Sequence, residues 1–213
     1  MPAENTQTQP DPVIRLFKSD FLEFFTHISP AAVLMVFLPL IGFLLWRAAR
    51  LNPAAWWKVP LAFLIGLLIW PLAEYLLHRF VFHWKPANPS ERMQRFLFLM
   101  HGVHHAQPRE KTRLVMPPVV SLPMAALFYG LFWLVVGRLF GAPGYVDGIT
   151  GGFLFGYVIY DMTHYALHHF SLKGEYFRKL RRHHMAHHFK THNAKYGVST
   201  WIWDDVFKTN PAE

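Results

Sequence analysis

Four long apolar runs constrain the fold of this chain more than any other feature. They cover Ala31 to Trp46, Pro60 to Leu77, Val119 to Val136 and Ile149 to Tyr160. A helix needs about 20 apolar residues to cross the hydrocarbon core of a bilayer. Each run therefore predicts a membrane helix, with the first and fourth continuing into polar flanks; shallow hairpins are the alternative. We expect an all-α integral membrane protein with about four transmembrane helices.

The residues before the first run are polar. They begin MPAENTQTQPDP and lack the basic start and apolar stretch of a secretory signal. Within them, Phe17 to Ile28 alternates charged residues with phenylalanines, which is typical of a helix lying on a membrane surface. The sequence predicts a polar lead over 1–30 with a possible interfacial helix, followed by one membrane domain over 31–213.

The basic residues predict an orientation in the membrane. Seventeen of the twenty-one lysines and arginines lie in the lead, in the loop between the second and third runs, and in the C-terminal tail. The two opposite loops hold only Arg47, Arg50, Lys58 and Arg138. Lysine and arginine concentrate on the cytoplasmic side, so we expect both ends to be cytoplasmic. The same rule accounts for the net charge of +8 without a nucleic acid partner.

Histidine is the unusual residue of this sequence. Almost all fourteen histidines fall within 78–105 and 164–192, after the second and the fourth apolar runs. Stretches separated by two crossings lie on one face of a membrane, so the histidines are expected to form a single site on the cytoplasmic side. The chain has no cysteine, which excludes thiolate zinc and iron–sulfur sites. Any metal must bind nitrogen or oxygen ligands.

The spacing of the histidines indicates metal binding. HGVHH (101–105) and HHMAHH (183–188) each contain three histidines at i, i+3 and i+4, along one face of a helix. In DMTHYALHH, His164 and His168 share a face with Asp161, whereas His169 is rotated away. We expect Asp161 to accept the outer ring N–H of a ligating histidine rather than to bind metal.

The first pair, in HRFVFH, is harder to interpret. His78 and His83 are five residues apart, a rotation of about 140° on an α-helix, which one metal could not easily bridge. The pair is expected to serve a metal from each side, or to lie where the helix ends.

Two alternatives compete with a catalytic dimetal site. A hydrogen-bonded structural role suits His27, His183 and His192, but ten clustered imidazoles near a bilayer surface are costly to desolvate unless they share a metal. A structural zinc needs about four ligands, so ten indicate two metals with open positions. A metal-transport protein would carry ligands within several spans, and the first and third runs contain no histidine.

In order, the motifs HRFVFH, HGVHHAQPREKTRLVMPP, YDMTHYALHH, HHMAHHFK and GVSTWIWDDVF resemble the fatty acid hydroxylase superfamily over about residues 60–209, most closely its fatty acid 2-hydroxylase branch. The resemblance implies a transmembrane bundle capped by a cytosolic helical part that holds a dimetal site. Its metal ligands would be His78, His83, His101, His104, His105, His164, His168, His184, His187 and His188.

The resemblance also implies an activity: a di-iron monooxygenase that hydroxylates a lipid acyl chain, at C2 of a fatty acid or fatty-acyl lipid, with O2 as co-substrate. Iron is preferred because zinc has no redox chemistry, although zinc can occupy such sites in a purified sample. The lead is too short for a fused cytochrome b5 domain, so electrons are expected from a separate cytochrome b5-like or ferredoxin-like protein. The same chemistry on a sterol, carotenoid or amino-acid-containing lipid remains an alternative.

Overall fold

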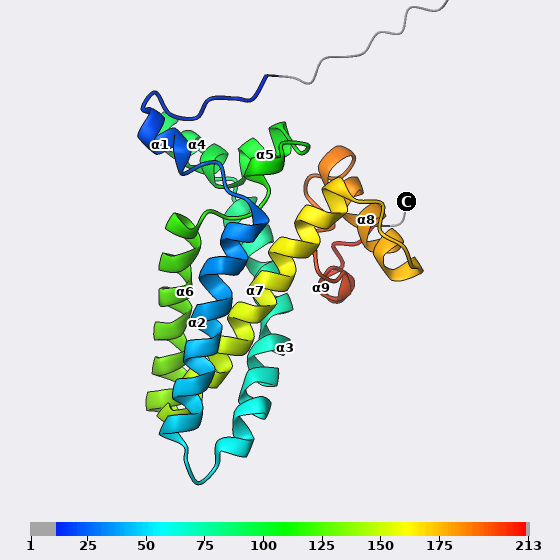
Figure 1. Cartoon of the computed structure of the whole chain (residues 1–213). Coiled ribbons are helices and arrows are strands. Elements are labelled where there is room, and N and C mark those ends of the chain that lie inside the picture. The colour runs from blue at the N-terminus through cyan, green and yellow to red at the C-terminus, as the bar shows by residue number, and fades with distance from the viewer. Residues whose placement is uncertain (1–11, 212–213) are drawn as a thin grey trace, which may run out of the picture.

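Four long helices form the body of the molecule. The computed structural model describes residues 12–211, and within this range every regular element is helical. The long helices are α2 (Pro30–Leu51), α3 (Val59–Leu77), α6 (Pro118–Phe132) and α7 (Val146–His169), which lie side by side in Figure 1. Helices α2, α3 and α7 each contain one of the predicted apolar runs, and the third run begins in α6 and continues into the following turn, η5 (Trp133–Leu139). The structure thus has a helix at each predicted position, and a count of four membrane crossings stays a prediction.

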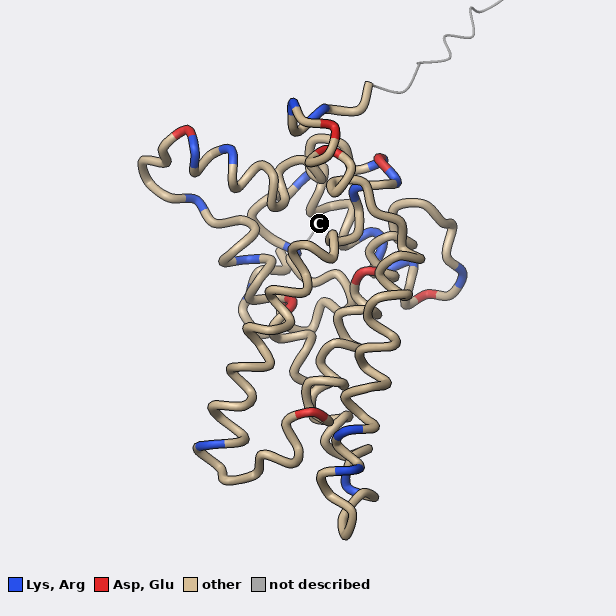
Figure 2. The backbone as a smooth tube through the Cα atoms, turned by 60° about the vertical axis from the view of Figure 1, so that its left-hand side comes forward, with Lys and Arg blue, Asp and Glu red and all other residues tan. Residues whose placement is uncertain are grey.

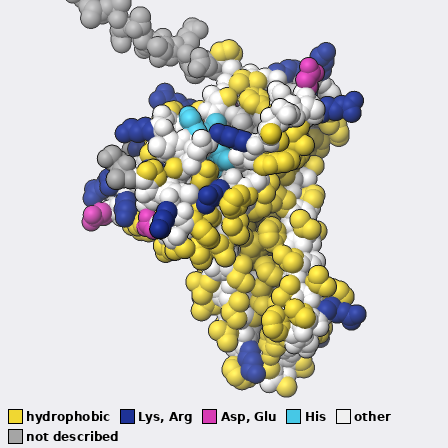
Figure 3. Space-filling model, turned by 180° about the vertical axis from the view of Figure 1, so that it is seen from behind, with side chains coloured by type: hydrophobic (Ala, Val, Ile, Leu, Met, Phe, Trp, Pro, Cys, Tyr) yellow, Lys and Arg dark blue, Asp and Glu magenta, His cyan; other side chains and the backbone are white. Residues whose placement is uncertain are grey.

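The outer surface of this bundle is apolar. Three helical stretches are long and apolar enough to cross a membrane, namely Pro30–Leu51, Trp56–Phe82 and Lys111–Leu139. Hydrophobic side chains cover the stem of the molecule in Figure 3. Helix α7 differs because most of its side chains are buried against the other helices and because it carries Asp147, Asp161 and the histidines. The membrane character expected from the sequence is therefore confirmed for three helices.

Helices α3 and α7 approach each other at backbone distance. A Cβ on Gly66 would lie 1.8 Å from the carbonyl oxygen of Ile149, and one on Gly152 would lie 1.8 Å from that of Phe63. No side chain fits at either position, so glycine permits the close approach. Further along, the Trp70 ring packs edge-on against Phe153, with centroids 5.0 Å apart. This contact sets the register of two helices that both lead into the histidine motifs.

The short helices gather at one end of the bundle and form a cap (Figure 1). They are α1 (Asp20–Phe24), α4 (Glu91–Leu97), α5 (Val103–Ala106), α8 (Glu175–Phe189) and α9 (Ile202–Val206). Shorter turns complete the chain: η1 (Trp56–Lys58), η2 (His78–Phe82), η3 (Phe98–Gly102), η4 (Lys111–Arg113), η5 (Trp133–Leu139) and η6 (Pro143–Tyr145). Most lysines and arginines lie on the cap, with a few at the far end of the bundle (Figure 2).

The N-terminal segment 12–28 lies against this cap. Its helix α1 spans only five residues of the predicted interfacial segment, and Phe21 and Phe24 are each 71% exposed. The segment is held by the Ile14 backbone N–H, which donates to Gln107 at 2.9 Å, and by Arg95, which donates to the Leu16 carbonyl at 3.1 Å. Residues 1–11 of the predicted lead lie outside the described residues, so the division at residue 30 stays a prediction.

Candidate metal centre

The two histidine-rich stretches converge in the cap, as the sequence predicts. Ten histidines form two groups of five, and within each group one ligand atom from every residue lies within 4.8 Å of the others. Cluster 1 contains His78, His83, His101, His105 and His187, and cluster 2 contains His104, His164, His168, His184 and His188. These are the ten histidines predicted as metal ligands, so the structure brings all of them together.

The ring nitrogens that converge are the Nε2 atoms. In cluster 1, Nε2 of His101 lies 3.1 Å from that of His78 and 3.0 Å from that of His105. In cluster 2, Nε2 of His188 lies 2.9 Å from that of His104 and 3.2 Å from that of His184. Lone-pair-bearing nitrogens directed at one point favour a cation at that point.

The clusters are neighbours rather than separate sites. The His105 ring of cluster 1 stacks on the His188 ring of cluster 2, with centroids 4.3 Å apart and planes 29° from parallel. Consecutive residues divide between the clusters at two places, because His104 and His105 belong to different groups, as do His187 and His188. Each three-histidine face expected from the sequence therefore contributes histidines to both clusters.

The geometry of HRFVFH agrees with the second alternative, because His83 lies where the helix ends, and it places both histidines in one cluster. Residues His78–Phe82 form a π-helical turn, and the His83 N–H donates to the His78 carbonyl at 3.0 Å. A π turn closes over five residues instead of four, so a spacing of five brings the two rings onto the same side. Their centroids are 5.0 Å apart, and both rings belong to cluster 1.

A loop after α8 supports the outer nitrogens of cluster 1. Nδ1 of His78 lies 2.5 Å from the Tyr196 carbonyl oxygen, and Nδ1 of His187 lies 2.7 Å from that of Ala194. A carbonyl accepts a hydrogen, so each Nδ1 carries the proton and each Nε2 is left with its lone pair toward the cluster. We name residues 194–200 the carbonyl loop.

Two buried carboxylates hold the carbonyl loop in place. Asp204 of α9 accepts the backbone N–H groups of Tyr196 at 2.8 Å and Gly197 at 2.7 Å. Glu74 of α3 accepts those of Val198 at 2.7 Å and Ser199 at 2.9 Å. Neither residue was predicted from the sequence, although a single carboxylate within an apolar run, as at Glu74, is itself a signal of a paired or functional group.

The buried rings fit metal ions. Burial lowers the pKa of His101, His104 and His184 well below its usual value, so these imidazoles are neutral at pH 7 and can bind a metal. Neither ring nitrogen of buried His164 has a hydrogen-bond partner. A buried polar atom without a partner is unfavourable by about 1–3 kcal/mol. A cation between the Nε2 atoms of cluster 2 supplies the missing partner, and ten imidazoles suit two ions.

Asp161 does not have the partner expected from the sequence. Its carboxylate accepts the Met116 backbone N–H at 3.3 Å, and no hydrogen bond joins it to a ligating histidine among the described residues. The reason is a long-range contact, because the chain after the Arg113 turn passes directly over this part of α7. Asp161 lines the same cavity as His164, and its catalytic role stays a prediction.

The remaining histidines lie outside both clusters. His27 contacts the Thr112 hydroxyl at 2.6 Å and the Arg113 guanidinium at 3.0 Å. His183 pairs with Asp204 at 3.1 Å. These hydrogen-bonded positions agree with the structural role expected for both residues. His169 and His192 belong to neither group.

A large cavity opens beside the centre. This outer cavity has a volume of about 410 Å³ and its wall includes His101, His104 and His164. Most of the other lining side chains are apolar, and they come mainly from the N-terminal segment, from residues 96–103 and from residues 114–120. An apolar cavity that reaches a set of metal ligands suits a hydrophobic substrate.

The chain is similar to several known proteins. The sequence profile of the family described as fatty acid hydroxylase matches residues 63–209. Fatty acid 2-hydroxylase of Rattus norvegicus is 39% identical over 215 residues, which cover 92% of this chain and 56% of that protein. Dihydroceramide fatty acyl 2-hydroxylase FAH2 of Arabidopsis thaliana is 38% identical over 197 residues, which cover 92% of this chain and 80% of that protein.

A solved structure is also similar. It is described as full-length scs7p with only the hydroxylase domain visible, and it superposes with a TM-score of 0.82 at 35% sequence identity. The match covers 91% of this chain and 70% of that chain. The present chain thus spans most of that solved chain but little more than half of the rat protein, at 56%.

Proposed function

Because this chain belongs to the fatty acid hydroxylase family, we propose that it hydroxylates an acyl chain of a membrane lipid, at C2 of a fatty acid or fatty-acyl lipid. The co-substrate is O2, and a separate cytochrome b5-like or ferredoxin-like protein supplies electrons. The observation that carries this proposal is the apolar outer cavity that ends at His101, His104 and His164, between the two five-histidine clusters.

Iron is the metal that suits this reaction. Imidazole binds iron, zinc and copper alike, so the ligand set does not choose between them. Two iron ions bound by the clusters would supply the redox chemistry that reduces O2 and oxidises a C–H bond, which zinc lacks. The protein's own part is to hold ten neutral imidazoles in fixed orientation, to exclude water with the apolar walls, and to place the acyl chain against His101, His104 and His164.

The cap lies on the cytoplasmic side, and α7 is the fourth crossing. Helix α7 is covered by α2, α3 and α6, so its polar residues do not face lipid (Figure 1). The concentration of basic residues on the cap supports this orientation (Figure 2). The exposed Phe21 and Phe24 of α1 suit an interfacial position at the same membrane surface.

Lipid analysis tests the activity. The gene is expressed in a host that lacks it, and total lipids are compared by mass spectrometry with and without the gene. We expect one added oxygen in a defined lipid class, with fragmentation placing it at C2. An oxygen added to a sterol, a carotenoid or an amino-acid-containing lipid would mean that the chemistry is as proposed but that the substrate is a different lipid.

Two substitutions test the site, one in each cluster. His104→Ala in cluster 2 and His187→Ala in cluster 1 should each abolish product while the protein still inserts into the membrane. Full activity in both variants would contradict the assignment. The transport alternative has its own measurement: metal flux into proteoliposomes would support it, whereas retained metal with iron-dependent O2 uptake would exclude it.

A further inference from the structure

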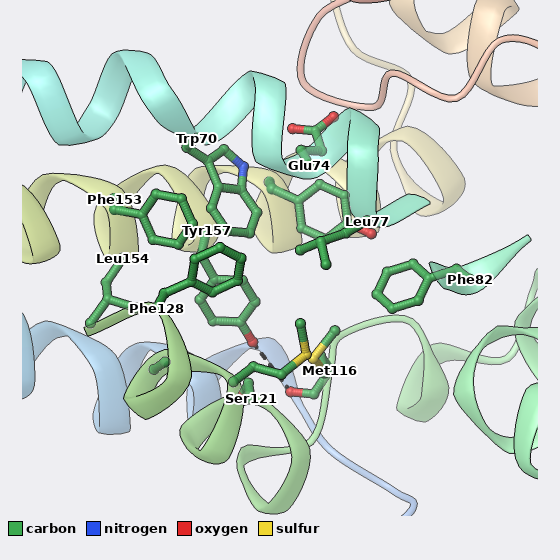
Figure 4. A pocket seen from close by; sticks show the side chains of 13 residues that line it. Trp70, Glu74, Leu77, Phe82, Met116, Ser121, Phe128, Phe153, Leu154 and Tyr157 are labelled. Carbon is green, nitrogen blue, oxygen red and sulfur yellow. Dashed lines mark hydrogen bonds between the residues drawn. The ribbon is translucent and has the colours of Figure 1, made fainter. Parts of the chain in front are cut away.

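Two cavities meet beside the metal centre. The outer cavity reaches the histidines, and a second, inner cavity of about 30 Å³ lies between α3, α6 and α7 (Figure 4). Three side chains, Phe82, Met116 and Tyr160, line both cavities. These residues form the partition between the two cavities, so a movement of their side chains would open a path from the outer cavity into the bundle.

The wall of the inner cavity is apolar. Figure 4 shows the rings of Phe128 and Phe153 at one end and Leu77 and Phe82 at the other. Glu74 also lines this cavity, but its carboxylate accepts hydrogen bonds from the carbonyl loop, as described above. Empty apolar cavities stay dry and take up hydrocarbon ligands. The inner cavity therefore suits a methyl or methylene group and does not suit water.

The outer cavity has a polar end at Arg113. This guanidinium contacts Glu23 of α1 at 2.5 Å, and its side chain is 3% exposed. Its Nε atom is buried and has no hydrogen-bond partner within residues 12–211. An unpaired buried N–H favours a ligand that brings an acceptor oxygen. Arg113 thus lines the outer cavity near the N-terminal segment, His101, His104 and His164 line the same cavity, and the inner cavity lies within the bundle.

We propose that the inner cavity receives the methyl end of the substrate's acyl chain and limits its length. This inference rests on the function proposed above. A lipid with its head-group oxygen at Arg113 has its first acyl carbons beside His101 and His104, and its tail continues past Phe82 and Met116. The inner cavity holds about one methylene-sized group, so a small change in its volume changes the longest chain that fits.

Two neighbouring alanines of α6 provide a matched test. Ala125 is 9% exposed and lines the inner cavity, whereas Ala126 is exposed on the outer face of the same helix. Ala125→Leu fills the cavity, and Ala126→Leu adds the same atoms outside it. For Ala125→Leu we expect kcat/KM for the longest accepted chain to fall about 10-fold or more relative to a chain two carbons shorter. Ala126→Leu should keep the wild-type chain preference.

A third variant changes the cavity in the opposite direction. Met124 also lines the inner cavity, so Met124→Ala enlarges it and should shift the preference to longer chains. This variant decides the question if Ala125→Leu does not fold. The substrates are a series of saturated fatty-acyl lipids in mixed micelles, and the readout is the chain-length distribution of hydroxylated product.

A second readout does not depend on activity. The same lipid series is offered to the purified variants, and the chain lengths of the lipids that stay bound are measured by mass spectrometry. Opposite shifts in the Ala125→Leu and Met124→Ala variants support the inference, whether or not the lipid is hydroxylated. The inference is overturned if both variants bind and hydroxylate the same distribution of chain lengths as the Ala126→Leu control and the wild type. A wild-type protein that selects chains by length without hydroxylating any would contradict only the proposed function.

Discussion

The two histidine clusters have the same number of ligands but different support. In cluster 1, the outer nitrogens of His78 and His187 donate to carbonyl oxygens of the carbonyl loop. In cluster 2, Nδ1 of His104, His184 and His188 is buried without any partner. Cluster 1 is therefore oriented by hydrogen bonds from outside, and cluster 2 is oriented by the packing of its helices.

The two clusters also differ in exposure, and cluster 1 is the more exposed. Cluster 1 has two partly exposed members, His83 and His105, whereas cluster 2 has one, His168. Histidine atoms reach the surface of the cap in Figure 3. The two clusters therefore depend on different parts of the chain. Cluster 1 requires the docked carbonyl loop, and cluster 2 requires α7 and α8 in register and a metal ion to satisfy its rings.

The largest expected effect comes from removing one ligand in each cluster. His164→Ala removes a cluster 2 ring that has no other partner, and His105→Ala removes a cluster 1 ring. Each variant should lose the ion of its own cluster and more than about 100-fold of product formation, because even the loss of an outer partner costs 10- to 100-fold. Metal per chain is measured by elemental mass spectrometry. Loss of both ions from either variant would show that the clusters are one coupled centre.

Asp204→Asn tests the support of cluster 1 alone. The amide cannot accept all the hydrogen bonds that the carboxylate takes from Tyr196, Gly197 and His183, so the carbonyl loop should loosen. We expect metal affinity at cluster 1 to fall about 10- to 100-fold and cluster 2 to keep its ion.

The adjacent residue provides the control for this substitution. Asp205 is exposed and bonds only Asn210 among side chains, at 2.6 Å, so Asp205→Asn should change neither cluster. Metal titration against a competing chelator separates the two sites. Equal losses at both clusters in the Asp204→Asn variant would show that the carbonyl loop acts on the whole cap.

Acidity should destabilise the metal-free protein. Burial lowers the pKa of His187 to about 4 and that of His105 to about 3, whereas the unfolded chain titrates near pH 6.5. As pH falls from about 6.5 toward 4, the unfolded state binds protons that the folded state does not. Each such histidine lowers the free energy of unfolding by up to about 1.4 kcal/mol per pH unit, less for partly exposed His105.

The measurement is denaturant unfolding of the metal-free protein in detergent across this pH range. Stability that stays constant, or rises as pH falls, would contradict the assignment of neutral buried rings. The metal-loaded protein gives the comparison. Ions that bind only the folded state add stability near neutral pH, and protons compete with them as the pH falls, so the two curves should converge in acid.

Helical periodicity predicted cluster 2 better than cluster 1. The pairs His164/His168 and His184/His188 are each four residues apart, and the structure places both pairs in one cluster. Cluster 1 uses the π turn at His78–Phe82, which α-helical geometry does not anticipate. A π turn inserts one extra residue into a helix and often occurs at functional sites. The spacing and the family resemblance thus predicted which ten histidines come together, but not their division into two groups.

The contacts between distant parts of the chain could not be predicted from the sequence either. The apolar runs predicted four helices because hydrophobic length is a local property. The binding of the carbonyl loop by Glu74 and the approach of Arg113 to Glu23 join distant parts of the chain, and no spacing rule predicts them. The same holds for Asp161, whose partner Met116 lies 45 residues away.

The smallest expected effect marks the boundary of cluster 1. His192 is exposed, and its ring centroid lies 5.8 Å from that of His105, although it belongs to neither group. His192→Ala should keep both ions and change product formation by no more than about twofold, as for a surface substitution worth about 0.5 kcal/mol. The metal titration designed for Asp204→Asn measures this variant too. If His192→Ala lost the cluster 1 ion, that cluster would have a sixth, solvent-facing ligand, and its greater exposure would then be part of how it binds metal.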